Sequence, residues 1–199
     1  VLDVPVAGAH DVIGSRAYGH DPETVTAMGR AAAKGLKDGG MLPVMKHMPG
    51  HGRAGADSHH NLPVVDAPRD VLEAHDFAPF RAMRNELMAM SAHVVYTAID
   101  PERPGTTSKI VIDEIVRGHI GFDGLLMSDD TSMNALAGTI GERARDIVAA
   151  GCDIVLHCNG VMAEMQAVVA DAALAGFTEP DASDEAALRA EFFALFPSA

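Results

Sequence analysis

Positive charge is scarce in this sequence, which limits the kinds of molecule that we expect the protein to bind. The 199 residues include 15 lysines and arginines against 28 aspartates and glutamates, a formal charge of -13 with histidine neutral. A surface with this balance repels phosphate groups, so we expect neither nucleic acid nor an anionic membrane as a partner. Apolar runs of about 20 residues, as a membrane-crossing helix requires, are also absent. Residues 1–6 lack the charged and apolar regions of a signal peptide, so we expect a cytoplasmic protein.

Cysteine is rare as well. Cys152 and Cys158 are the only two, and they lie at the ends of one apolar stretch that has the composition of a strand. A strand rises about 3.3 Å per residue, so the two thiols should be roughly 20 Å apart, too far for a disulfide bond. We therefore expect two reduced thiols, as in cytoplasmic proteins.

Hydrophobic residues make up 48% of the chain, enough for one globular core. Apolar runs predict strands at residues 1–6, 41–46, 87–95, 124–128 and 152–157. Helices are predicted at residues 22–38, after Ser108, and at 141–150, 161–175 and 184–196. The first helix has Asp21 as its cap, followed by Pro22 and Glu23, the order typical of a helix start. Alternating strands and helices favour a single α/β domain with a parallel sheet.

Asp129 is the first candidate for chemistry, because it follows the apolar run 124–128. A parallel strand there would deliver the carboxylate to the carboxyl end of the sheet, where α/β enzymes place their active sites. The alternative is that Ser128, Asp129 and Asp130 cap the next helix, a common role for these residue types. The residues alone leave both interpretations open.

Three cationic or polar residues should face the same end of the sheet. Lys46 and His47 end the second strand, and Arg16 follows the first. A lysine at such a place can hydrogen-bond hydroxyls or an anion, and the planar fork of an arginine suits a polar ligand. The alternative for Lys46 is an ordinary surface lysine.

Asp57 and His59 form a second chemical unit in a glycine-rich loop. Their spacing of two places both side chains on one face of an extended backbone, where the carboxylate can orient the imidazole. Such a histidine can transfer protons near neutral pH. The alternative is a solvated polar loop.

A metal site is the remaining alternative for this loop, since imidazoles with carboxylates form a common zinc ligand set. The loop contains His47, His51, His59 and His60. The helical His-Glu-x-x-His spacing is absent, and Pro49 with two glycines makes the stretch a loop, so we expect no metal.

These motifs match a known family. The heptapeptide Lys-His-Met-Pro-Gly-His-Gly at residues 46–52, the Asp-Ser-His triplet at 57–59 and the Ser-Asp-Asp block at 128–130 with Met133 resemble the family 3 glycoside hydrolases. Within that family the sequence is most similar to the bacterial β-N-acetylglucosaminidases of peptidoglycan recycling. The similarity runs from residue 1 to about residue 170, and Met48 departs from it where an aromatic residue is common.

The resemblance implies a (β/α)₈ barrel and a role for each candidate residue. Asp129 corresponds to the nucleophile, and His59 with Asp57 to the acid/base dyad of a retaining mechanism. Arg16, Lys46 and His47 correspond to sugar-binding residues. No cofactor is implied, and the expected partner is a small carbohydrate, an N-acetylglucosaminyl muropeptide, bound by a monomer.

The resemblance also implies that the barrel is partial. Five strands are predicted where a closed barrel has eight, so we expect residues 1–199 to be one catalytic domain lacking its first strands, with poor stability by itself. Three alternative functions stay open: a phosphorylase, because an imidazole repels phosphate less than a second carboxylate would; a β-glucosidase of the same family; and an inactive or sugar-binding remnant.

Overall fold

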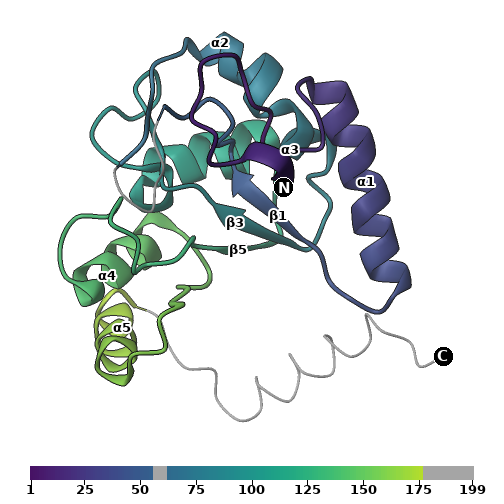
Figure 1. The fold of residues 1–199 in the computed structure, drawn as a ribbon. Coiled ribbons are helices and arrows are strands. Elements are labelled where there is room, and N and C mark those ends of the chain that lie inside the picture. The colour runs from purple at the N-terminus through teal and green to yellow at the C-terminus, as the bar shows by residue number, and fades with distance from the viewer. Residues whose placement is uncertain (56–61, 177–199) are drawn as a thin grey trace.

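The computed structural model describes residues 1–55 and 62–176 (Figure 1). Short helical turns are η1 (Gly14–Arg16), η2 (Leu72–Asp76), η3 (Gly105–Thr107) and the longer π-helical η4 (Val111–Ile120). The α-helices are α1 (Pro22–Asp38), α2 (Arg69–Val71), α3 (Ala78–Ala82), α4 (Ile140–Ala150) and α5 (Met162–Leu174). The strands are β1 (Val44–Met48), β2 (Val64–Val65), β3 (Met88–Ser91), β4 (Val95–Tyr96) and β5 (Leu125–Met127).

A parallel sheet of β1, β3 and β5 lies at the centre of the fold, in the order of the sequence. Figure 1 shows α1 alongside this sheet, while α4 and α5 contact each other beyond β5. Strands β2 and β4 form a second, two-stranded parallel sheet. The parallel β/α architecture predicted from the sequence is therefore confirmed.

Residues 1–6 run beside β1 but do not form the predicted strand. Two ladder-like bonds remain, from Leu2 N to the Lys46 carbonyl and from Val6 N to the Gly52 carbonyl. Between them the carboxylate of Asp3, not a backbone carbonyl, accepts from the N–H of His47. The prediction of a strand is wrong here because a side chain replaces the ladder bond, and because Pro5 has no N–H.

The predicted strand at residues 152–157 is interrupted in the same way. It retains one parallel bridge, between Met127 and Ile154. Asp153 Oδ2 accepts from the N–H of Leu126 (2.8 Å), and Ser128 Oγ accepts from the N–H of Leu156 (2.9 Å). Side chains again take the donors that a regular strand would pair, so the segment follows β5 without forming a strand.

Two further strand predictions need correction. The run 87–95 divides into β3 and β4, because the N–H of Ala92 still bonds the Met48 carbonyl whereas Val95 turns to the Pro63 carbonyl and the other sheet. The run 41–46 begins late, at Val44 directly after Pro43. The two-residue β2 was not predicted, since two residues carry no periodic signal.

The predicted helices agree with the structure where it describes them. Asp21 caps α1 by accepting from Thr24 N (2.8 Å). Ser108 Oγ accepts from Val111 N (3.1 Å) at the start of the helical stretch that contains η4. α4 and α5 match the predictions at 141–150 and 161–175. The predicted helix at 184–196 lies outside the described residues.

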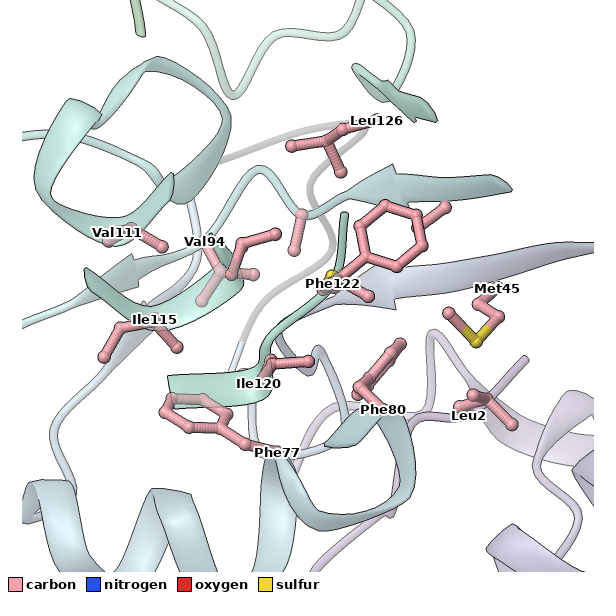
Figure 2. Packing of buried hydrophobic residues seen from close by; sticks show 14 of the residues in the cluster. Leu2, Met45, Phe77, Phe80, Val94, Val111, Ile115, Ile120, Phe122 and Leu126 are labelled. Atoms are coloured by element: carbon pink, nitrogen blue, oxygen red, sulfur yellow. The ribbon is translucent and has the colours of Figure 1, made fainter. Parts of the chain in front are cut away.

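The core joins the sheet to the helices that cover it. Figure 2 shows Phe80 of α3 beside Leu2 and Met45, and Ile115 and Ile120 of η4 on the side nearer Phe77. All of these side chains are buried. Over residues 1–55 and 62–176, none of the helices combines the length and the apolar character that crossing a membrane requires.

Candidate active site

Asp129 lies two residues beyond β5, at the carboxyl end of the sheet, with a half-buried side chain. Its Oδ1 accepts from the N–H of Asp130 (2.9 Å). The residues that follow form turns, and the next helix, α4, begins at Ile140 with Thr139 as its cap. The alternative that residues 128–130 cap the next helix is therefore wrong, and the sheet places the Asp129 carboxylate where the strand-end prediction expected it.

Asp130 holds the turn that carries Asp129. Its Oδ1 accepts from the N–H groups of Ser132 (3.1 Å) and Cys158 (3.0 Å), and its Oδ2 accepts from the Ser132 hydroxyl. Burial alone would raise the pKa of Asp130, but these donors outweigh it and the pKa is lowered. The carboxylate therefore stays ionised and the turn stays tied to the segment after β5.

Asp3 organises the loop that follows β1. The carboxylate is fully buried and accepts from His47 Nδ1 (2.7 Å), from His47 N (3.2 Å to each oxygen) and from His51 N (2.7 Å). Burial raises the pKa of Asp3, yet the charge and hydrogen bond of His47 and the N–H of His51 outweigh burial, so the pKa is lowered. With its Nδ1 committed to Asp3, His47 presents Nε2 as the atom that can meet a ligand.

The charge of Asp129 acts on two further imidazoles, those of His51 and His93. The rings of His47 and His51 are 5.7 Å apart, edge to face. Burial lowers the pKa of His51 and of His93, while the charge of Asp129 opposes that shift at both residues and the charge of His47 adds to it. The structure thus brings His47 and Asp129 into one electrostatic neighbourhood, from the ends of β1 and β5.

Lys46 and Arg16, the two predicted cations, differ in what the structure shows of them. Burial, Asp130 and Asp129 raise the pKa of the Cys158 thiol while Lys46 opposes them, so Lys46 and Asp129 act on the same group. Arg16, in η1, is exposed, and its Nη2 donates to the Val12 carbonyl (2.7 Å).

Asp57 and His59, the predicted acid/base pair, lie outside the described residues. In residues 1–55 and 62–176 there is no group of three or more His, Cys, Asp or Glu side chains arranged to hold a metal ion. Cys152 and Cys158 are both free thiols.

Asp3 and His93 are site residues that the sequence prediction missed. A charged residue inside the apolar run Val-Leu-Asp-Val is itself a signal, because a buried carboxylate needs donors. His93 gave a similar signal, since it interrupts the apolar run 87–95. Neither signal indicates which group the side chain bonds, because the hydrogen-bond partners are brought near only by the fold.

Comparison with known proteins gives a consistent result. The profile of the glycosyl hydrolase family 3 N terminal domain matches residues 1–189. A beta-hexosaminidase of Neisseria gonorrhoeae is 46% identical over 177 residues, covering 87% of this chain and 47% of the relative. A beta-hexosaminidase of Chromobacterium violaceum is 44% identical over 173 residues, covering 85% and 46%. The chain therefore spans about half the length of the curated relatives it matches.

Solved structures agree with the sequence matches. NagZ from Neisseria gonorrhoeae, in complex with N-trifluoroacetyl-D-glucosamine, superposes with a TM-score of 0.78 at 41% identity, covering 100% of this chain and 55% of that one. A family 3 β-N-acetylglucosaminidase from Paenibacillus sp. str. FPU-7 gives a TM-score of 0.84 at 34% identity, covering 100% and 40%.

Proposed function

Because the chain belongs to glycosyl hydrolase family 3, we propose that it is the catalytic part of a retaining exo-β-N-acetylglucosaminidase with Asp129 as the nucleophile. The observation that carries the proposal is the position of Asp129, half-buried at the carboxyl end of the parallel sheet and next to Asp130, whose carbonyl bonds His93. The two beta-hexosaminidases and the β-N-acetylglucosaminidase that the chain resembles support the same reaction class.

The reaction proceeds in two displacements. The Asp129 carboxylate attacks the anomeric carbon, the glycosidic C–O bond breaks, and the departing oxygen takes a proton from His59, which Asp57 orients. The same imidazole then removes a proton from water, the water oxygen bonds to the anomeric carbon, and the ester to Asp129 breaks. Two inversions give net retention of configuration, without a metal or an organic cofactor.

The residues at the end of β1 bind the sugar in this proposal. His47 is held by Asp3 so that Nε2 points away from the buried carboxylate, toward a sugar hydroxyl. Lys46 and Arg16 supply further donors to the sugar. The substrate is a terminal β-linked N-acetylglucosamine on a muropeptide or a related glycan.

We propose that residues 1–199 form one catalytic domain that lacks the first strands of a (β/α)₈ barrel. The parallel order of β1, β3 and β5, with extended segments at residues 1–6 and 152–157, supports five consecutive strand positions of such a barrel. We also propose that the whole protein is a cytoplasmic monomer.

The test is release of the chromophore from an aryl β-N-acetylglucosaminide. It is run on this chain and on an extended protein, in which segments of the Neisseria gonorrhoeae relative complete the chain to that relative's length. We expect turnover by the extended protein and its loss by several orders of magnitude in Asp129→Ala, because the nucleophile forms the bond to carbon. A slow substrate, a 5-fluoro-N-acetylglucosaminyl fluoride, should leave a sugar adduct on the peptide that contains Asp129.

Asp123→Asn is the matched control, since Asp123 is an exposed aspartate in the loop before β5. It should turn over as the unmodified protein does. Undiminished activity in Asp129→Ala, or an adduct on another residue, would refute the nucleophile assignment. A sugar 1-phosphate among the products in phosphate buffer would show phosphorolysis in place of hydrolysis.

A further inference from the structure

Three buried polar side chains form a hydrogen-bonded row beside the turn that carries Asp129. Ser91 at the end of β3, Thr106 in η3 and His93 are each at most 2% exposed. Ser91 Oγ lies 2.7 Å from Thr106 Oγ1, Thr106 Oγ1 lies 2.9 Å from His93 Nδ1, and His93 Nε2 lies 3.0 Å from the carbonyl oxygen of Asp130. The row therefore ends on the residue next to the proposed nucleophile.

The chemistry of the groups fixes the direction of every bond in the row. The carbonyl oxygen of Asp130 only accepts, so His93 Nε2 carries a hydrogen and donates. In a neutral imidazole Nδ1 then accepts, the Thr106 hydroxyl donates to it, and the Ser91 hydroxyl donates to Thr106. Burial lowers the pKa of His93, against the opposing charges of Asp129 and Asp130, which favours this neutral form.

The peptide group that receives the row is also held from its other side. The carbonyl of Asp130 accepts from His93, and the N–H of Thr131, in the same peptide group, donates to the Leu156 carbonyl (2.9 Å). One bond comes from the β3 side of the turn and the other from the segment after β5. The carbonyl also accepts from the N–H of Met133 within the turn (3.1 Å), so His93 supplies the bond that ties this peptide group to the β3 side.

We propose that His93, in the neutral Nε2–H tautomer that its bonds to Asp130 and Thr106 require, is a positioning residue that holds the turn of Asp129 in register with the end of β3. The inference rests on the proposed function, since it concerns the aim of the same nucleophile. His93 acts through the Asp130 carbonyl and binds no sugar. Its loss should therefore affect the chemical step more than substrate binding.

The first experiment is Thr106→Val in the extended protein. Valine keeps the shape of threonine but cannot donate to His93 Nδ1, so the ring loses one of the two bonds that orient it. We expect kcat for the aryl β-N-acetylglucosaminide to fall by about 10- to 100-fold, the scale of a misplaced catalytic group, with KM little changed. Thr106→Ser, which restores the hydroxyl, should recover most of kcat. Thr107→Val is the matched control, because the Thr107 hydroxyl bonds only locally, at 3.4 Å from the Pro104 carbonyl.

The second experiment reads the tautomer directly. Long-range ¹⁵N–¹H correlation spectra distinguish Nε2–H from Nδ1–H imidazoles, and the His93 signal is assigned by its absence from His93→Gln. We expect Nε2–H in the unmodified protein and, in Thr106→Val, a shifted Nδ1 resonance, because that nitrogen loses its donor. An Nδ1–H tautomer in the unmodified protein overturns the inference, even if the variants fail to fold.

The outcomes separate the two proposals. Turnover in the unmodified protein with the same kcat in Thr106→Val refutes positioning and leaves the nucleophile assignment intact. A rise in KM with kcat unchanged refutes it as well. If the unmodified protein shows no turnover, the proposed function fails. The tautomer measurement then decides by itself whether the hydrogen bonds from Ser91 to Asp130 have the directions inferred above.

Discussion

Replacing Asp3 by asparagine should destabilise the fold by an amount that depends on pH. The Asp3 carboxylate accepts two short bonds of 2.7 Å, one on each oxygen, from His51 N and His47 Nδ1. Asparagine keeps one of these acceptors and places an NH₂ group against the other donor. If Oδ1 keeps the bond to His51, the amide faces His47 Nδ1, and the imidazole must lose its Nδ1 hydrogen to accept.

The expected size follows from the single charged bond that is lost. A hydrogen bond to an ionised group contributes about 1.5–3 kcal/mol, so we expect about 2 kcal/mol at pH 7. For a chain of this length that lowers Tm by roughly 4–8 °C. Asparagine also orients the His47 ring less firmly than the carboxylate does, so KM for the aryl glycoside should rise in the extended protein.

The pH dependence follows from the lowered pKa of Asp3. At this site the unfolded chain binds a proton more readily than the folded chain does. The ionised carboxylate therefore stabilises the fold at pH values above its ordinary pKa of 3.8. That stabilisation is lost as the pH falls through the lowered, folded value. The difference in Tm between the natural chain and Asp3→Asn should therefore be full at pH 7 and shrink below about pH 4.

Thermal unfolding followed by circular dichroism at a series of pH values measures this difference. Asp123→Asn removes the same charge from an exposed site and should shift stability by less than about 0.5 kcal/mol at any pH. A Tm of Asp3→Asn equal to that of the natural chain at pH 7 would refute the reasoning. A loss of Tm that does not change with pH would refute the electrostatic part of it.

Two further changes probe the packing of the site. Gly52→Ala would place a Cβ 2.3 Å from the carbonyl oxygen of Val4, so the loop must move, and urea unfolding should show that the free energy of unfolding falls by about 1–3 kcal/mol. Gly55→Ala is the control, because a Cβ there meets nothing within 4 Å. Equal losses of stability in the two variants would contradict the close approach of Gly52 to Val4. Cys158 is exposed, whereas Cys152 is buried with its pKa raised to about 12 by burial, so iodoacetamide should modify Cys158 in the folded chain and Cys152 only after denaturation. Equal rates by mass spectrometry would contradict the burial of Cys152.

The features that the sequence predicted well are those with local causes. Helix α1 begins where Asp21 can cap it, because cap and capped N–H are three residues apart. Asp129 was placed correctly because an apolar strand directly precedes it. In both cases the neighbours that determine the structure are neighbours in the sequence.

The features that it missed depend on partners far along the chain. Asp3 meets His47 across 44 residues, and His93 meets Asp130 across 37. The strands predicted at residues 1–6 and 152–157 fail for the same reason, since each is interrupted by a side chain that bonds the backbone of a neighbouring strand. A run of apolar residues predicts extended backbone, but it carries no information about which donor a distant carboxylate will take.

The segment after β5 sets a limit on how far the chain can be shortened. Asp129 has no helix or strand of its own, and its turn is tied to Leu156 through Thr131 and to the N–H of Cys158 through Asp130. A fragment that stops at residue 150 would keep Asp129 and every strand of the central sheet, yet lose both ties. A shortened fragment must therefore extend at least to residue 158 if the turn of Asp129 is to keep its bonds to Leu156 and Cys158.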